Sequence, residues 1–319
     1  PHSHVLRVNM DASGKKATGV TYIDGNGQEV EQPADLVVLS AFQLHNVRLL
    51  LLSKIGKPYD PQTGEGVVGR NYAYQMNGGV KLFFNEDHNF NPFAATGTSG
   101  IFIDEFNAEN FDHSGLGFVG GATISATITG GRPIQQMSTP KDAPKWGSGW
   151  KQAIKKSYLH TMNIGSSGSV MPYKQCYLDL DPTYKDLHGQ PLLRMTFDWQ
   201  PNELKMTNFI GTKAEEIARQ INPPHYEMGF MGMDAHYDVR PYQSTHTTGG
   251  AVMGDSPHNS VVNKYLQCWD VPNVFVLGAC CFPQNLAYNP TGIVCATALF
   301  AANAIRHQYL AHPGPLVQA

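Results

Sequence analysis

The stretch ADLVVLSAFQLHNVRLLLLSKIG, residues 34–56, decides the fold class of this chain. Its first part, ADLVVLSA, is a nearly continuous apolar run, which is typical of a buried, parallel and central strand. In its second part, apolar side chains recur at helical spacing at Leu44, Val47, Leu51 and Ile55. We expect Gly56 to end that helix, because glycine is common just after a helix terminus. Strand, small-residue turn and helix predict an α/β layer of the nucleotide-binding type.

The same pattern returns near the end of the chain. VPNVFVLGA, residues 271–279, is predicted to be a second buried strand, and a closing helix is expected from Thr291 to His307. Residues 4–40 are predicted to form a β-meander, in which the turn DGNGQ supplies the positive φ of a tight hairpin. Because the α/β pattern leaves and returns, residues 1–66 and 237–319 are predicted to form one discontinuous domain.

Residues 67–236 have a different texture. Aromatic-rich alternating stretches such as GGVKLFFNE, SGIFIDEF and LLRMTFDW are typical of strands with one buried face. NELKMTNFIGTKAEEIARQIN, residues 202–222, has the pattern of an amphipathic helix. We therefore predict an antiparallel sheet with helices on one side, forming a substrate-binding domain, and a mixed α/β fold for the whole chain.

The composition excludes several classes of function. The 319 residues carry a formal net charge of -3, and no basic excess points to nucleic acid. The sequence contains no run of 18 or more apolar residues, so no membrane span is predicted. Five cysteines without a C-x-x-C pair argue against a disulfide framework, although one bridge is possible, and against a metal site. Buried, unreactive thiols are the favoured interpretation of Cys176, Cys268, Cys280, Cys281 and Cys295.

Three polar stretches stand out: YQSTHTTGGAVMG, NVFVLGACCFPQN and YNPTG. His246 in the first is a candidate general base, and the alternative is that it caps its loop together with the neighbouring threonine hydroxyls. Asn289 in the third is a candidate polar contact, and the alternative is a simple N-cap ahead of Pro290. The helix that begins here offers unpaired N–H groups and a positive dipole end, which suit an electron-rich ligand.

Taken in order, STHTTGGAVMG, SVVNKYLQCWDVPNVFVLGACCFPQN and YNPTGIVCATALFAANAI resemble the C-terminal signature of the glucose–methanol–choline (GMC) oxidoreductases. Within that family the chain most resembles the flavoprotein large subunits of bacterial gluconate, 2-ketogluconate, fructose and sorbitol dehydrogenases. The resemblance is dense over residues 242–305. Weaker support comes from the meander, from residues 34–53 and from GVVGRNY at residues 66–72.

The resemblance implies FAD as cofactor and roles for particular residues. His246 falls at the position of the active-site histidine that accepts the substrate's hydroxyl proton, and Asn289 at that of the second catalytic residue. Gly278 and Ala279 would lie near the phosphate and ribityl part of the flavin. Asn289, Pro290 and Thr291 would lie beside the pyrimidine end of its ring, where the helix start stabilises negative charge. Tyr242, Gln243 and Tyr288 are candidate substrate contacts, with simple packing as the alternative.

One part of the family pattern is missing. No strand–turn–helix carries a G-x-G-x-x-G motif, which in this family holds the FAD pyrophosphate near the N-terminus. The Rossmann-like, FAD-binding domain of residues 1–66 and 237–319 is therefore expected to be incomplete. Either the chain is a fragment, or a second chain supplies the FAD-binding half.

The leading hypothesis is an FAD-dependent dehydrogenase that oxidises a hydroxyl of a sugar, polyol or sugar acid. The resemblance implies that electrons pass to a partner such as a cytochrome c, with a further small subunit, at the periplasmic face of the inner membrane. The alternatives are a GMC-type oxidase that uses O₂, and a non-catalytic fragment or sugar-binding module. The substrate, the electron acceptor and the oligomeric state are left open by the sequence.

Overall fold

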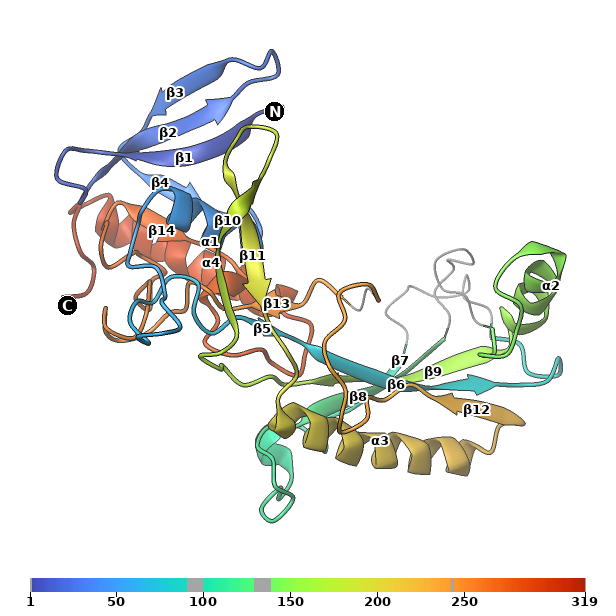
Figure 1. The fold of residues 1–319 in the computed structure, drawn as a ribbon. Helices are drawn as coiled ribbons and strands as arrows, with labels where there is room; N and C mark the ends of the chain where they lie inside the picture. The colour runs from blue at the N-terminus through green and yellow to red at the C-terminus, as the bar shows by residue number, and fades with distance from the viewer. Residues whose placement is uncertain (1, 91–99, 129–138, 242–243, 319) are drawn as a thin grey trace.

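Two structural regions are visible in the computed structural model, which describes residues 2–90, 100–128, 139–241 and 244–318 (Figure 1). One region holds the N-terminal meander, a parallel strand pair and the last helix. The other is a broad antiparallel sheet with a long helix beneath it. The predicted mixed α/β fold with antiparallel sheets is confirmed, whereas the domain boundaries at residues 66/67 and 236/237 stay predictions.

The meander consists of β1 (His4–Met10), β2 (Ala17–Ile23) and β3 (Glu29–Pro33), joined antiparallel in that order. Gly27 takes a φ of 79° in the second turn, a value that glycine adopts without strain. The N–H of Val8 donates to the Ser53 hydroxyl at 2.8 Å, which joins the meander to the end of the first helix. The predicted meander is confirmed.

The parallel pair is β4 (Val37–Leu39) and β14 (Val274–Val276), and α1 (Gln43–Leu52) follows β4. Both the parallel orientation and the strand–helix order match the prediction. The expectation of a central strand was wrong for the described part of the chain, where β4 pairs only with β14. The apolar run does not reveal this, because it reports burial of side chains rather than the number of neighbouring strands.

Helix α1 ends earlier than predicted. Ser53 is its C-cap, and Lys54 takes the left-handed conformation with φ 56°. The N–H of Ile55 donates to Leu50 at 3.0 Å and that of Lys54 to Leu51 at 3.2 Å, the bonding pattern of a Schellman motif. Lysine at the position where glycine is usual hid this terminus, and Gly56 lies in the turn beyond it.

The five-stranded antiparallel sheet has the order β12 (His225–Met228), β6 (Met76–Phe83), β9 (Thr161–Gly168), β8 (Ala122–Ile128) and β7 (Gly100–Ile103). Helix α3 (Pro201–Ile221) packs across β6, β9 and β8 and covers one face, as predicted (Figure 1). A buried cluster lies between the two and includes Val80, Leu82, Ile124, Ile164, Met206 and Ile210.

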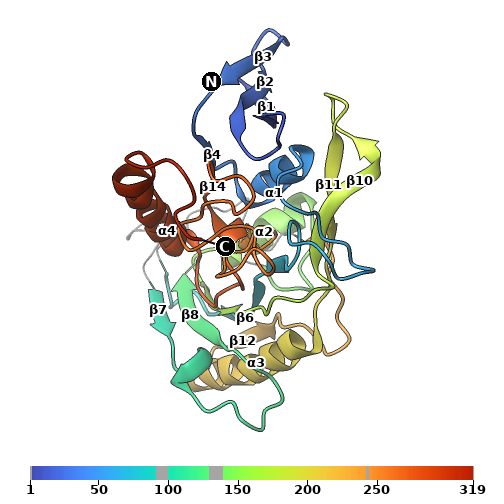
Figure 2. The same ribbon diagram turned by 90° about the vertical axis from the view of Figure 1, so that its left-hand side faces the viewer.

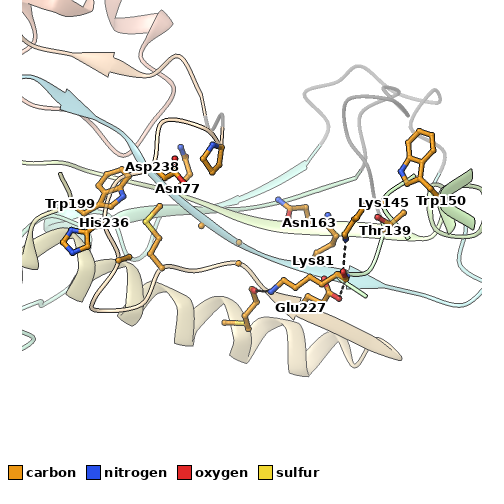
Figure 3. Close-up of a pocket in the computed structure, with 18 residues that line it drawn as sticks. Asn77, Lys81, Thr139, Lys145, Trp150, Asn163, Trp199, Glu227, His236 and Asp238 are labelled. Atoms are coloured by element: carbon orange, nitrogen blue, oxygen red, sulfur yellow. Dashed lines mark hydrogen bonds between the residues drawn. The ribbon is translucent and has the colours of Figure 1, made fainter. Parts of the chain in front are cut away.

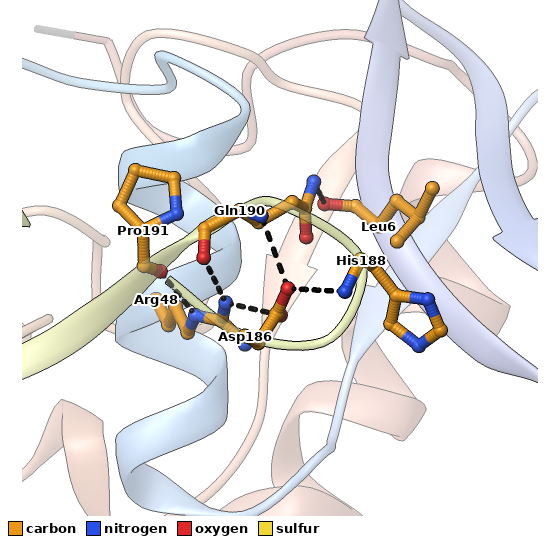
Figure 4. A network of polar contacts seen from close by, with 6 residues as sticks. All are labelled: Leu6, Arg48, Asp186, His188, Gln190 and Pro191. Atoms are coloured by element: carbon orange, nitrogen blue, oxygen red, sulfur yellow. Dashed lines mark hydrogen bonds and ion pairs between the residues drawn. The ribbon is translucent and has the colours of Figure 1, made fainter. Parts of the chain in front are cut away.

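A two-stranded ribbon, β10 (Tyr177–Lys185) and β11 (Pro191–Thr196), runs from the sheet region to the meander (Figure 1). An ion pair joins the tip of this ribbon to α1: Arg48 Nη2 donates to Asp186 at 2.6 Å, and the two side chains are 10% and 14% exposed (Figure 4). Burial acts to raise the pKa of Asp186, but hydrogen bonds from Arg48 and from two backbone N–H groups lower it to about 2.

The remaining elements are short, apart from two helices. They are β5 (Ala73–Tyr74) paired with β13 (Thr247–Thr248), α2 (Gly147–Ser157), α4 (Thr291–Ala304) with a π-helical turn Ile305–Tyr309, and the 3₁₀ turns Ala108–Asn110 and Ala279–Cys281.

Helix α4 is strongly apolar and yet largely uncovered. It lies at the edge of the molecule in Figure 2, and only Ala301 and Ala304 are fully buried. Leu299 is 72% exposed and Phe300 51% exposed. Cys295 also lies exposed on this helix, which corrects the expectation of five buried thiols; the other four are buried, and all five are free.

Candidate functional site

His246 lies immediately before β13 and is held by contacts to its ring and its backbone. Its Nδ1 lies 2.6 Å from Oε1 of Gln75. Its carbonyl accepts from the Gln75 backbone N–H at 3.0 Å and from Asn285 Nδ2 at 2.7 Å. The interpretation in which His246 caps its loop together with neighbouring threonine hydroxyls was therefore wrong. The amide of Gln75 holds the ring, and the hydroxyls of Thr247 and Thr248 have no partner among the described residues. Burial lowers the pKa of His246, so the ring is neutral at pH 7.

Gln75 connects this histidine to the segment in front of α4. It is fully buried between β5 and β6, and its Nε2 donates to the carbonyls of Leu286 at 2.6 Å and Tyr288 at 2.9 Å. Asn289 is the next residue along the chain. The fold thus brings His246 and the Asn289 segment to the two ends of one buried amide. Sequence reasoning missed Gln75, since an isolated glutamine carries no motif.

Asn289 does not cap α4. Pro290 occupies the N-cap position with helical φ and ψ, its carbonyl accepts from Val294 N–H at 3.0 Å, and no side-chain cap bond forms. The simple N-cap interpretation was therefore wrong, because the helix begins one residue later than it requires. The Asn289 side chain is exposed, and Thr291 follows at the first turn of the helix.

Gly278 and Ala279 lie at the carboxyl end of β14, the edge of a parallel sheet where ligands commonly bind. Gly278 takes a φ of 133°, and a Cβ added there would make ordinary contact with Asn46 Nδ2 at 3.6 Å, so the position is not tightly packed. The carbonyl of Ala279 accepts from Gly249 N–H at 3.1 Å, which places this turn beside the end of β13. These residues, predicted to contact a cofactor, thus lie against the His246 segment.

Several buried side-chain oxygens in this region have no hydrogen-bond partner among the described residues. They are Oγ1 of Thr247 and of Thr248, Oε1 of Gln43 and Oδ1 of Asn285. Gln43 Nε2 donates to the carbonyl of Gly249 at 2.8 Å, which fixes its position beside β13. Buried acceptors without partners are costly, so the region fits a ligand with several N–H or O–H donors, such as the hydroxylated ribityl chain of a flavin.

A phosphate cradle is not formed by the glycines of residues 64–69. Their spacing spells G-x-G-x-x-G, but no helix follows them. A Cβ on Gly66 would lie 2.0 Å from the Pro58 carbonyl oxygen, and one on Gly69 would lie 2.0 Å from that of Leu178. These two glycines allow close backbone packing, and the described residues show no substitute for the dinucleotide motif.

The three predicted substrate residues are only partly placed. Tyr242 and Gln243 lie outside the described residues. Tyr288 is 42% exposed, and a hydrogen bond from it is the main cause that lowers the pKa of Asp104, near the end of β7. Tyr288, the residue before Asn289, therefore reaches across to the antiparallel sheet.

A cavity of about 760 Å³ lies over the face of the sheet opposite α3 (Figure 3). Asn77, Gly79 and Lys81 alternate along β6 and line it, and Asn163 of β9 pairs with Lys81 in register. Trp199, His236 and Asp238 lie at one end, and Lys145 and Trp150 at the other. Since Asn77 follows Gln75 by two residues, the cavity begins close to the His246 site. Its polar floor suits a hydroxylated ligand.

The far end of the cavity is positively charged. Lys81, Lys141 and Lys145 line it together with one carboxylate, Glu227. Nζ of Lys141 donates to the carbonyl of Met228 at 2.7 Å, and Nζ of Lys145 to that of Lys141 at 2.8 Å (Figure 3). Burial lowers the pKa of Lys81, while Glu227 acts to raise it. The sequence did not reveal this cluster, because its lysines come from segments far apart in the chain.

Metal and membrane sites have no support in the part of the chain that the structure describes. No group of three or more His, Cys, Asp or Glu side chains is placed to hold a metal ion. None of the helices described combines the length and the apolar character needed to cross a bilayer.

Residues 172–298, which include His246, the carboxyl end of β14 and Asn289, match the family described as GMC oxidoreductase. Residues 172–298 carry the C-terminal domain of the GMC oxidoreductases. The GMC resemblance drawn from the three polar stretches is confirmed.

Two relatives match nearly the whole chain. Gluconate 2-dehydrogenase flavoprotein of Pantoea cypripedii is 53% identical over 318 residues, covering 100% of this chain and 52% of the relative. The fructose dehydrogenase large subunit of Gluconobacter japonicus is 24% identical over 319 residues, covering 96% and 53%. The chain thus spans about half the length of these GMC relatives.

Solved structures agree on the GMC fold. Formate oxidase of Aspergillus oryzae, studied for the modification of its FAD, superposes with a TM-score of 0.62 at 17% identity, covering 97% of this chain and 61% of that one. Pyridoxine 4-oxidase superposes with a TM-score of 0.60 at 16% identity, covering 96% and 58%. At this level of identity the likeness concerns the fold alone.

Proposed function

We propose that this chain is the substrate-side part of an FAD-dependent dehydrogenase that oxidises a hydroxyl of a sugar, polyol or sugar acid. The observation that carries the proposal is the Gln75 bridge, which joins the half-buried His246 to the backbone directly before Asn289. The names of the gluconate and fructose dehydrogenase relatives support the substrate class. The cationic end of the cavity favours a sugar acid among the three classes.

The residues divide the chemistry between them. FAD supplies, when bound, the acceptor for the hydride that leaves the substrate carbon. His246, neutral because burial lowers its pKa, accepts the proton of the substrate hydroxyl. The Asn289 amide donates a hydrogen bond to the same oxygen and orients it. The N-terminus of α4 stabilises negative charge beside Pro290 and Thr291.

The residues that would hold the cofactor form only part of a site. Gly278 and Ala279 lie at the carboxyl end of β14, where Gly278 is not tightly packed, and Pro290 and Thr291 begin α4. The bare apolar face of α4 and the outer edge of β4, which pairs with β14 alone among the described strands, leave room for further structure. We propose that an FAD-binding half, in the same polypeptide or in a second chain, covers this face and supplies the pyrophosphate site.

Electron transfer to partner subunits is part of the same proposal. The relative named as a large subunit supports an assembly with other subunits. We propose a cytochrome c and a small subunit as the partners, and the periplasm as the location. Co-purification of a haem protein from a periplasmic membrane fraction would support both, and a haem-free cytosolic protein would contradict them.

Visible absorption spectroscopy tests the function directly. The protein purified together with its proposed FAD-binding half should show flavin bands, and these should bleach anaerobically on addition of gluconate, fructose, sorbitol or glucose. A flavin that stays oxidised with all four would contradict the proposed substrate class. A colourless preparation would favour a non-catalytic module. Peroxide formation in air, compared with turnover by an artificial acceptor, separates a dehydrogenase from an oxidase.

A further inference from the structure

Gln75 makes hydrogen bonds at both ends of its side chain, and these determine which way its amide points. Nε2 faces the carbonyl oxygens of Leu286 at 2.6 Å and Tyr288 at 2.9 Å. Both partners can only accept, so the group facing them must be the –NH₂ end of the amide. A flipped amide would set its oxygen against two carbonyl oxygens. The network therefore assigns Oε1 to the side of His246.

The orientation of this amide determines the tautomer of His246. Oε1 of Gln75 is an acceptor without a proton, and it lies 2.6 Å from Nδ1 of the ring. A neutral imidazole carries one N–H, and the short contact requires that hydrogen on Nδ1. The lone pair is then on Nε2, which makes no hydrogen bond within the described ranges. Only this nitrogen can accept a proton from a substrate.

We propose that Gln75 is a positioning residue that holds His246 in its Nδ1–H tautomer and so makes Nε2 the base of the reaction, an inference that rests on the proposed function of His246. The step balances simply: the substrate hydroxyl loses its proton to Nε2, and Nδ1–H keeps its bond to Gln75. The oxygen's lone pair then forms the carbonyl as the hydride leaves for the flavin that the proposed function supplies.

Gln75 also sets the distance between the two catalytic candidates. Its backbone N–H binds the carbonyl of His246 at 3.0 Å, and its side chain binds the ring of the same residue. The carbonyl of Tyr288, the residue before Asn289, lies at the other end of its amide. One buried residue thus anchors both segments, and its loss would shift the base relative to Asn289.

Nitrogen-15 NMR of histidine-labelled protein tests the tautomer without reference to activity. The chain holds 13 histidines, and the signal that is lost in His246→Asn identifies the one of interest. The expected spectrum shows a neutral ring at pH 8 with its proton on Nδ1, the tautomer that free histidine disfavours. A neutral His246 protonated on Nε2 would overturn the proposal.

The variant Gln75→Met removes the amide and keeps the volume. The matched control is Gln267→Met, because Gln267 is also buried and also donates to two backbone carbonyls, those of Pro272 at 2.6 Å and Gly314 at 2.9 Å. We expect Gln75→Met to lower the Nδ1–H population and to reduce kcat by about 10²-fold with little change in KM. Gln267→Met should lower Tm without changing the tautomer or kcat.

The outcomes separate the two proposals. If Gln75→Met leaves the tautomer and kcat as they are, the positioning role is wrong. If the variant does not fold, the tautomer of His246 in the wild-type protein still tests the positioning role of Gln75. If the wild-type ring is an Nδ1–H tautomer in a protein that oxidises no hydroxyl substrate, Gln75 holds the ring as inferred, and the proposed function fails on its own.

Discussion

Oε1 of Gln75 lies 2.6 Å from Nδ1 of His246, although 171 residues separate the two in sequence. This contact joins the residue between β5 and β6 to the segment before β13, and it gives the candidate base a defined orientation. The opposite end of the same amide holds the backbone that leads into α4.

The first prediction concerns pH. Burial lowers the pKa of His246 below its ordinary 6.5, so the neutral base is present at pH 7 and is lost only in more acidic solution. We expect kcat/KM to be flat near neutrality and to fall as pH drops through the lowered pKa. His246→Asn should reduce kcat by about 10²–10⁴-fold, because a positioned base contributes that much. A kcat/KM that falls already between pH 8 and 7 would contradict this.

The second prediction concerns Asn289. Asn289→Ala removes the amide that would bind the substrate oxygen, and we expect a loss in kcat of about 10²-fold or more. Asn289→His should retain part of the activity, since its ring also presents an N–H. Stopped-flow measurement of flavin reduction isolates the hydride step in each variant. Equal rates of flavin reduction in wild type and Asn289→Ala would exclude a role of Asn289 in binding the substrate oxygen.

The third prediction concerns the cationic end of the cavity. Lys141→Gln combined with Lys145→Gln removes two positive charges and should lower kcat/KM for gluconate by about tenfold at low salt, with little effect on uncharged sorbitol. Added salt should reduce kcat/KM for gluconate in the wild type and have less effect in the double variant. Lys213→Gln on α3, where Lys213 pairs with Glu216, is the control. A similar loss for both substrates would argue against an electrostatic role.

The fourth prediction concerns the clamp in Figure 4. Arg48 binds Asp186 and the carbonyl of Pro191, and Gln190 Nε2 donates to the carbonyl of Leu6 at 3.1 Å. Arg48→Met removes the charged donor from a partly buried carboxylate that keeps its bonds from the backbone N–H groups of His188 and Gln190. We therefore expect a loss of about 1.5–3 kcal/mol in the free energy of unfolding, measured by urea denaturation. Arg194→Met, which breaks the more exposed pair with Asp179, should cost far less.

The same clamp should respond to acid. The pKa of Asp186 is lowered from 3.8 to about 2 in the folded protein, so its contribution to stability is present above pH 4. That contribution is lost as pH falls from about 4 to 2, where the folded-state carboxylate is protonated. Unfolding free energies of wild type and Asp186→Asn should therefore converge across this window. A difference in unfolding free energy that stays constant from pH 4 to 2 would contradict a stabilising role of the Arg48–Asp186 pair.

The fifth prediction concerns α4. Leu299 is 72% exposed here, and a surface substitution usually changes stability by less than about 0.5 kcal/mol. If an FAD-binding half covers the helix, Leu299→Glu should instead abolish flavin retention or lower Tm by several degrees. Lys156→Glu on the exposed end of α2 is the matched control. Unchanged flavin content and Tm in Leu299→Glu would count against a covered face.

Local sequence pattern determined most elements and the family. The glycine-bearing turns of the meander, the apolar runs of β4 and β14 and the amphipathic spacing of α3 each depend on residues near in sequence. His246, Gly278 and Asn289 could be singled out because they lie in dense local stretches. The end of α1 was misplaced, since Lys54 takes a left-handed conformation that its residue type does not announce.

Only the tertiary structure decided how these parts act together. Gln75 became significant once strand pairing set it between His246 and Tyr288, and the lysine cluster formed only when β6 met the segment before α2. The partnership of β4 with a single strand and the exposure of α4 are likewise properties of neighbours. Periodicity in a sequence reports which side of an element is apolar, whereas hydrogen bonds and charges across distant segments depend on where the chain returns.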